Sequence, residues 1–146
     1  MAGDAHTYDP LNHIVQFGEI MLDSGWGPDE WIKVEHQSPA WEDDVGVSGE
    51  VQRSKINDHR GTVTITLLQT SRKNDALSAH YNLDRATPGG IGAKPFLLMD
   101  LGGTTLISAD QAWLQKAPDQ TRARKAGTTE WQIRLAYMVE HHGGNN

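Results

Sequence analysis

The sequence predicts a mainly β protein: a β-sandwich or open barrel with one flanking α-helix. Apolar and polar residues alternate along several segments, glycine-rich turns separate those segments, and one stretch alone has clear helical periodicity. The 146 residues fit a single domain, residues 1–146. A chain of this length can bury a core without disulfides or a structural metal.

Two segments show the alternation most clearly. Within residues 60–70, apolar side chains including Val63 point to one face, and threonines occupy the other. Residues 131–139 alternate in the same way from Trp131 onward. Weaker strands are predicted at 13–17, 31–36, 50–55, 95–100 and 104–108. The predicted core comprises Val63, Ile65, Leu67, Leu77, Leu97, Ile133 and Leu135, together with Trp31 and Trp131 packed against the sheet.

One helix is expected over residues 72–84, covering one side of the sheet. Ser71 is a suitable N-cap residue, and Pro88-Gly89-Gly90 ends the helix. A shorter helical turn is expected near residues 109–114. The helical stripe consists of Leu77, His80, Tyr81 and Asp84.

Residues 37–49, between two predicted strands, show no periodicity, and we expect a long loop that becomes ordered on assembly. Loops of this length are usually functional or disordered. Trp41 has no obvious core to enter there, and aromatic anchors dominate protein interfaces. We therefore expect Trp41 to contact another chain, with Glu42, Asp43 and Asp44 meeting basic groups on it.

The charge and composition exclude several classes of function. With 13 Lys and Arg against 19 Asp and Glu, the net charge of −6 argues against a duplex-DNA binder. The absence of cysteine removes disulfides, thiolate metal sites and Cys nucleophiles, and suits a reducing compartment. No signal peptide is visible in residues 1–9, and no apolar run approaches the roughly 20 residues of a membrane span.

No catalytic, cofactor-binding or metal-binding residue is predicted, so the chain is not expected to be an enzyme. The seven histidines lack metal-ligand spacing. Residues 100–105, Asp-Leu-Gly-Gly-Thr-Thr, are similar to a phosphate-binding turn, but the flanking alternation favours a tight hairpin turn. The glycines before Lys94 lack the spacing of a phosphate loop.

Residues 54–71, Ser-Lys-Ile-Asn-Asp-His-Arg-Gly-Thr-Val-Thr-Ile-Thr-Leu-Leu-Gln-Thr-Ser, with Asn-Asp-Ala-Leu-Ser at 74–78, resemble the tail tube protein family of contractile-tailed bacteriophages. The similarity extends in consistent order over most of the chain, and it is weaker over residues 18–49. Further matching segments are Tyr8-Asp9-Pro10, residues 95–101 followed by Gly-Gly-Thr-Thr, residues 109–116 with Trp113, and a closing strand from Glu130-Trp131.

The resemblance implies a structural virion protein of the phage tail. Six copies would join their sheets into a hexameric ring, and stacked rings would form the inner tube that conducts DNA without binding it specifically. The implied partners are other copies, the tail sheath, baseplate and tail-terminator proteins, and a tape measure protein in the lumen, with no membrane. Assembly would take place in the host cytoplasm. Residues 1–12 would form an N-terminal arm, 37–49 an inter-subunit loop and 143–146 a flexible tail.

Residues 31–36 and 50–55, which flank the long loop, are expected to contribute to the inner wall of the tube. With Ile32 and Val34 facing the core, Lys33 and Glu35 face the lumen. With Val51 facing the core, Glu50, Gln52 and Ser54 face the lumen, which leaves Arg53 and Lys55 on the buried side. A wall that passes a polyanion should be net negative, because clustered cations would hold phosphates.

Three other functions stay open from the sequence. The tube subunit of a phage-like injection device or type VI secretion system is a near neighbour of the tail tube. A carbohydrate-binding β-sandwich could use Trp26, Trp41 or Trp113 as a platform. A small enzyme could bind phosphate at residues 100–105.

Overall fold

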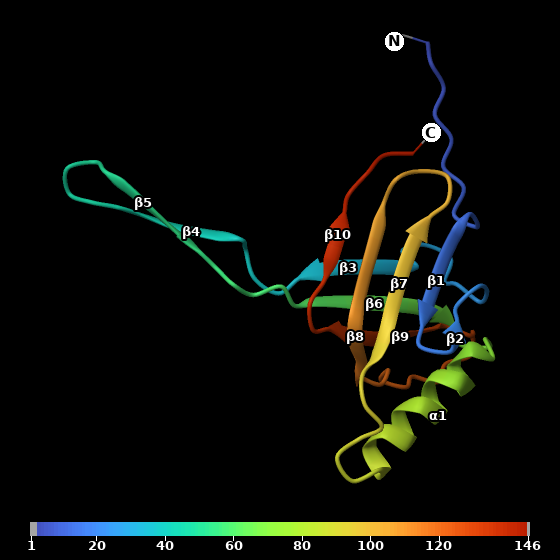
Figure 1. Cartoon of the computed structure of the whole chain (residues 1–146). Helices are drawn as coiled ribbons and strands as arrows, with labels where there is room; N and C mark the ends of the chain where they lie inside the picture. Colours follow the sequence, from blue (N-terminus) through green and yellow to red (C-terminus); the bar gives the residue numbers. More distant parts are fainter. Residues whose placement is uncertain (1–2, 146) are drawn as a thin grey trace.

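The computed structural model describes residues 3–145: one body of strands with a single helix beside it, and a two-stranded hairpin that projects away (Figure 1). In chain order the elements are β1 (His13–Phe17), β2 (Ile20–Met21), β3 (Ile32–His36), β4 (Trp41–Val45), β5 (Val51–Lys55), β6 (Gly61–Leu68), α1 (Lys73–Ala86), β7 (Lys94–Asp100), β8 (Leu106–Lys116), β9 (Thr128–Leu135) and β10 (Val139–His141).

Eight strands form one antiparallel sheet in the order β2-β1-β7-β8-β9-β6-β3, with β10 paired to β8. Strands β3, β6 and β9 run crosswise to β1, β7 and β8 (Figure 1). The long strand β8 belongs to both layers, because its first part pairs with β7 and its last part with β9. Register shifts interrupt both pairings, and such bulges bend a strand. The single sheet thereby folds over itself into a mainly β sandwich, as predicted.

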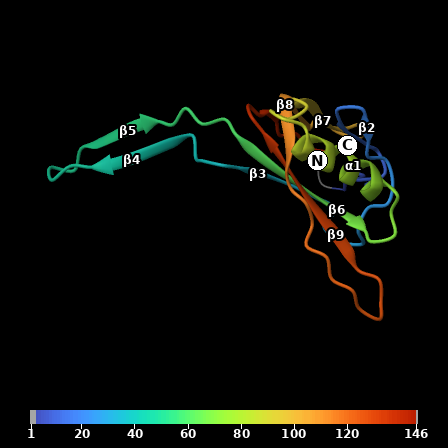
Figure 2. The same ribbon diagram turned by 90° about the horizontal axis from the view of Figure 1, so that it is seen from below.

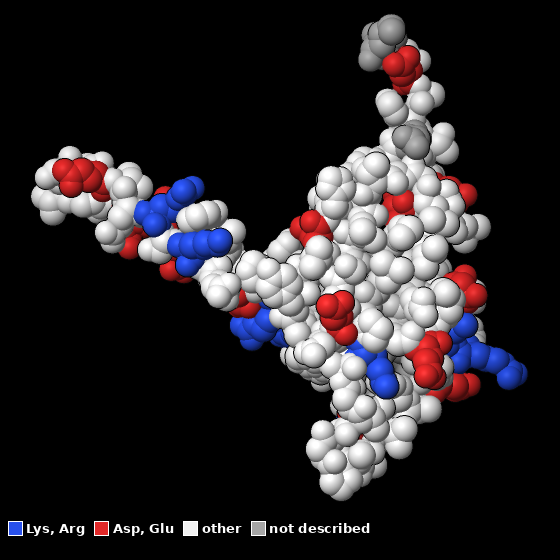
Figure 3. Space-filling model, viewed as in Figure 1, with Lys and Arg blue, Asp and Glu red and all other residues white. Residues whose placement is uncertain are grey.

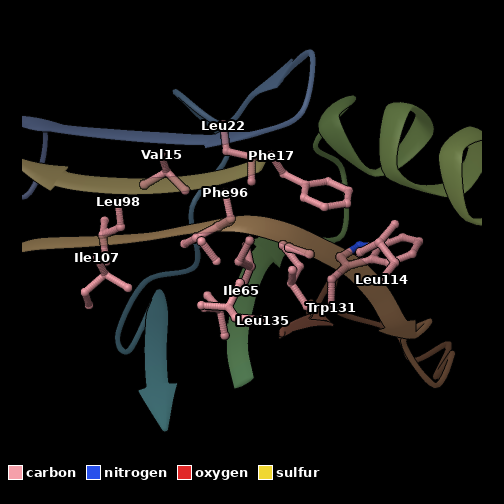
Figure 4. Packing of buried hydrophobic residues seen from close by; sticks show 14 of the residues in the cluster. Val15, Phe17, Leu22, Ile65, Phe96, Leu98, Ile107, Leu114, Trp131 and Leu135 are labelled. Atoms are coloured by element: carbon pink, nitrogen blue, oxygen red, sulfur yellow. The ribbon is translucent and has the colours of Figure 1, made fainter. Parts of the chain in front are cut away.

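The core lies between the two layers (Figure 4). The alternation predicted for β6 and β9 is confirmed, since their inward side chains are buried. Leu97 is a correction: β7 turns Phe96, Leu98 and Asp100 inward, so Leu97 is only half-buried on the outer face. The fully buried side chains include Val15, Phe17, Leu22, Val63, Ile65, Leu67, Leu77, Phe96, Ile133 and Leu135.

The helix packs with the stripe that the sequence predicted. Leu77 is fully buried, Tyr81 meets the ring of Trp131 edge-on, and His80 meets Phe17. Burial lowers the pKa of His80, which favours the neutral ring against this apolar contact. The N-cap position is Arg72 rather than Ser71, although the Ser71 hydroxyl still accepts a hydrogen bond from the backbone N–H of Lys73 at 3.2 Å.

Two elements predicted in the C-terminal half are wrong: one is a strand instead of a helical turn, and the other ends earlier than predicted. Residues 109–114 form no helical turn but lie within β8, where Ala109, Ala112 and Leu114 point into the core. The strand predicted over 131–139 ends at Leu135, and the chain turns before β10. The hairpin predicted around Gly102-Gly103 is confirmed, with β7 and β8 paired up to Met99 and Leu106.

Residues 37–49 are not the irregular loop that the sequence predicted. Strand β4 pairs with β5 over five residue pairs, and this two-stranded hairpin, which we call the arm, projects from the body (Figures 1 and 2). Every residue of both strands is exposed. The assignment of Val51 to the core face, with Arg53 and Lys55 buried, is therefore wrong, because neither face of the arm is covered by its own chain.

The C-terminal residues are tied to the β7–β8 turn. Thr105 exchanges hydrogen bonds with the backbone of Gly143, and the Asn145 amide donates to the buried Asp100 carboxylate at 2.8 Å. The predicted flexible tail, 143–146, is thus hydrogen-bonded over residues 143–145, and residue 146 lies outside the described residues. Residues 3–11 of the predicted N-terminal arm are exposed, and residues 1–2 also lie outside the described range.

Candidate assembly surfaces

The arm has two chemically different faces. Residues directly opposite each other in an antiparallel pair share a face, and neighbours along a strand alternate. One face, here called the apolar face, carries Trp41, Asp43, Val45, Val51, Arg53 and Lys55. The other, here called the acidic face, carries Glu42, Asp44, Gln52 and Ser54.

The apolar face exposes large side chains to solvent. Trp41 is 45% exposed, and Val45 and Val51 are more exposed still. The Arg53 guanidinium lies 3.9 Å from the centre of the Trp41 ring, close enough for a cation–π contact. In the space-filling view the arm shows both basic and acidic side chains (Figure 3). An isolated two-stranded ribbon is only marginally stable in water, so an uncovered apolar face is a candidate contact surface.

This geometry divides the predicted inter-subunit residues. Trp41 and Asp43 lie on the apolar face, whereas Glu42 and Asp44 lie on the acidic face. One flat partner surface cannot cover all four at once. Their contact with another chain stays a prediction, and the register indicates which of them would act together.

A second candidate surface is the outward face of the β3–β6–β9 layer. A hollow of about 620 Å³ lies over it, with Lys33 and Glu35 on β3 among its lining residues. Its carboxylates are Asp29, Glu30, Glu35 and Glu130, and its cation is Lys33. Lys33 lies 3.5 Å from Glu35. Four carboxylates against one ammonium leave this lining net negative, and we call it the acidic sheet face.

The five predicted lumen residues therefore fall into two places. Lys33 and Glu35 lie together on the acidic sheet face. Gln52 and Ser54 lie on the arm and Glu50 in its turn, outside the main sheet. Glu130 also lines the acidic sheet face and was not predicted from the sequence. It lies two residues before Gln132 on β9, so both point to the same polar face, and this alternation could have identified it.

The same layer has two open edges among the described strands. Strand β3 pairs with β6 on one side only. The last part of β8, after Ala112, pairs with β9 but no longer with β7. Unpaired strand edges are ready to pair with another chain. The layer β3-β6-β9-β8 could thus be extended at both ends.

The turn at residues 100–105 has no backbone donors to offer a phosphate at its centre. Gly102 N–H donates to the Asp100 carboxylate at 2.9 Å, Gly103 N–H to the Asp100 carbonyl, and Thr104 N–H to the Gly144 carbonyl. The turn is filled by its own aspartate and the C-terminal residues. This favours the structural role over the phosphate-binding alternative.

The tryptophans considered for carbohydrate binding do not form one platform. Trp26 packs against Trp31 with ring centres 4.7 Å apart, Trp41 lies on the arm, and Trp113 lies on β8. Within residues 3–145, no cluster of three or more His, Asp or Glu side chains is placed to hold a metal ion. No helix in the described part of the chain has both the length and the apolar character to span a bilayer.

These are the candidate contact surfaces of a mainly β protein, and comparison with known proteins gives its family. Residues 17–143 match the family described as bacteriophage PhiTE tail tube protein. The chain therefore belongs to this family of phage tail tube proteins, which is a structural family and not an enzyme family. The resemblance found in the sequence is confirmed.

Known relatives agree with this assignment. "Structural protein ORF10" of Pseudomonas phage KPP10 is 27% identical over 151 residues, covering 99% of this chain and 87% of the relative. Among solved structures, the anti-feeding prophage cap (AFP tube terminating cap) has a TM-score of 0.61 at 8% identity, with 97% of this chain and 95% of that chain covered.

Two components of an extracellular contractile injection system (PVC) share the fold as well. Its sheath/tube terminator in the extended state has a TM-score of 0.56 at 8% identity, covering 94% of this chain and 99% of that chain. Its sheath-tube complex gives 0.55 at 9% identity, covering 92% and 91%. At these identities the likeness concerns the fold, and it confirms the predicted mainly β, tail-tube-like class.

Proposed function

We propose that this tail tube protein forms hexameric rings that stack into the inner tube of a phage tail and conduct DNA. The main observation in support is the β3-β6-β9-β8 layer, which combines an acidic sheet face with two open edges. Pairing β3 of one copy with the end of β8 of the next would close these layers into a ring and leave neither edge of the layer free.

The charge supports a conduit rather than a DNA-binding surface. Six chains at −6 each carry −36 per ring. With the acidic sheet face turned to the lumen, Glu35 and Glu130 would line the wall and Lys33 would be neutralised by its neighbour. DNA phosphates would then find few cations to hold them.

The arm would join neighbouring copies by its apolar face. It points away from its own body (Figures 1 and 2), so a second copy is the surface we assign to it. Val45, Val51 and Trp41 would supply buried apolar area, and Arg53 and Lys55 would meet the acidic surface of a net negative neighbour. The arm is thus proposed to hold the rings together.

The remaining partners follow from the tail tube role. A sheath around the tube, a terminator at its end, a baseplate, a tape measure protein in the lumen and assembly in the host cytoplasm are all part of this proposal. The structures that share this fold come from tube, sheath and terminator assemblies. A tube of a phage-like injection device is the second candidate, favoured by the fold of those same structures.

Electron microscopy of the purified protein tests the proposal directly. We expect rings with six-fold symmetry that stack into tubes, and a protein that stays monomeric at all concentrations would contradict it. Trp41→Ala should weaken tube formation and leave the folded monomer intact, because Trp41 is exposed, contacts Arg53 on the arm and lies outside the buried core cluster. Normal tubes from that variant would contradict the role of the arm.

A further inference from the structure

The arm joins the sheet through residues 37–40 and 56–60, which we call the root. The pattern of backbone hydrogen bonds between the two strands is irregular there. Gln37 N–H donates to the Arg60 carbonyl at 3.1 Å, and the ladder resumes where Ile56 N–H donates to Ala40 at 2.9 Å. Between these two bonds lie two residues on the first strand and three on the second. Such an extra residue is a bulge, and it changes the direction of the ribbon.

Within the described root, no backbone hydrogen bond joins residues 38–39 to residues 57–59. Pro39, one of the two residues on the shorter side, has no N–H to donate to a ladder. The arm strands beyond the root make no contact with a covering layer, since all their residues are exposed. Side chains at the root are therefore in a position to set the angle between the arm and the sheet.

Asp58 provides that connection. Its Oδ2 accepts the Ser38 hydroxyl at 2.7 Å from the opposite strand, and Arg60 Nη2 at 2.9 Å. Its Oδ1 accepts Arg60 Nε at 2.9 Å and the Arg60 backbone N–H at 3.2 Å. One carboxylate thus joins both strands of the root and engages the guanidinium fork in two places. These hydrogen bonds hold the pKa of Asp58 well below its usual range.

The residues on either side of this carboxylate are attached to the body. The His59 carbonyl accepts Met138 N–H at 2.7 Å, and the His59 ring stacks on Tyr137 with centres 4.3 Å apart. Gln37 accepts a hydrogen bond from Arg134 Nη1 of β9 at 2.7 Å. The root is therefore fixed to β9 and to the turn after it, and Asp58 lies between this fixed part and the arm.

We propose that Asp58 is the positioning residue of the arm: it sets the direction in which the arm leaves the sheet before any partner binds. The direction of the arm is a property of the single chain, and only its benefit for assembly rests on the proposed function. An arm that is already aimed loses less conformational freedom when it docks, so a second copy would bind it more readily. Ser38 and Arg60 act through the same carboxylate, Ser38 by joining the strands and Arg60 by orienting the group.

Because the chain contains no cysteine, spin labels can be attached at two introduced cysteines alone, and the direction of the arm can be measured from the distance between them. Nitroxide labels would be placed on Val47→Cys at the arm tip and Leu101→Cys in the β7–β8 turn, both exposed. Val47 is nine positions along the chain from Ser38 of the root, a span of about 30 Å if this stretch is extended at about 3.3 Å per residue. Electron–electron double resonance on the dilute, unassembled chain would then report the tip-to-body distance distribution.

We expect a narrow distribution for the otherwise native chain and a distribution at least twice as wide for Asp58→Ala. Ser38→Ala should broaden it less. The matched control is Asp44→Ala, which removes a carboxylate from the arm itself, outside the root, and should leave the width unchanged. Equal widths for Asp58→Ala and Asp44→Ala would overturn the proposal.

A milder variant keeps the test decisive if Asp58→Ala fails to fold. Arg60→Lys retains the charge but cannot make the two-point contact, and it too should broaden the distribution. An unchanged width there, with circular dichroism showing a folded chain, would overturn the proposal. Failure of the native protein to form tubes would contradict the proposed function but leave the distance result on the monomer standing.

Discussion

Leu67 is completely buried near the C-terminal end of β6, and its neighbours on the same face, Val63 and Ile65, are buried as well. Leu67→Ala should lower the free energy of unfolding by about 2–5 kcal/mol, because the transfer energy of the lost methyl groups adds to the cost of the cavity. Urea denaturation of the unassembled chain would measure it. Leu68→Ala, next along the strand and exposed, is the control and should change stability little.

Asp58 also predicts how stability depends on pH. Its pKa in the folded chain is depressed by Arg60 and Ser38, whereas an unfolded Asp titrates near 3.9. A depressed pKa contributes stability that is present above the unfolded value and is lost as the pH falls toward the folded one. The stability difference between the native chain and Asp58→Asn should therefore be largest above about pH 5 and shrink below about pH 4. A difference that stays constant from pH 7 to pH 3 would contradict this.

At the scale of elements, the arm is a ribbon whose faces can be tested separately. Val51 and Gln52 are consecutive residues on β5 that point to opposite faces. Val51→Asp should strongly reduce tube formation, because a carboxylate on the apolar face would be desolvated on docking. Gln52→Asp adds the same charge to the acidic face and should leave assembly much closer to normal.

The measurement is sedimentation of tubes from equal amounts of folded protein. Equal loss of tubes in both variants would show that the arm does not dock by one face. Circular dichroism provides the check on folding, and we expect both variants to fold normally, since the arm contributes nothing to the buried core.

At the scale of the whole molecule, charge distribution decides whether a tube conducts DNA. Glu35→Lys combined with Glu130→Lys would make the acidic sheet face basic. We expect tubes of this variant to bind DNA in a salt-sensitive way, since each added cation can neutralise a phosphate. The control, Glu19→Lys with Asp75→Lys, makes the same change in net charge at exposed positions off this face.

Tube-bound DNA would be measured by co-sedimentation at low and at moderate salt. Binding in the Glu35 and Glu130 variant but not in the control would support the placement of the acidic sheet face on the lumen. Equal binding in both would mean that only net charge matters, and it would contradict that placement.

The strands with one buried face were determined by the sequence itself. In β6, apolar and polar residues alternate in the sequence. Every second side chain enters the core and the threonines between them point outward, so the fold requires a period of two. The helix stripe of Leu77 and Tyr81 was predicted for the same reason, at a period near 3.6. The resemblance to the tail tube family was also visible in local sequence, chiefly in residues 54–78.

Only the tertiary structure decided the features that local pattern does not encode. Strand β4 of the arm has no buried face and no alternation by which to recognise it, whereas β5 falls within the strand predicted at 50–55. Leu97 lies in an unbroken apolar run, and strand pairing alone decides which of its members face inward. Glu35 and Glu130 line the same hollow, and Ser38 hydrogen-bonds to Asp58, although each pair is far apart in the chain. Such contacts depend on which strands pair and in what register, and pairing energies between distant segments leave no periodic trace in the sequence.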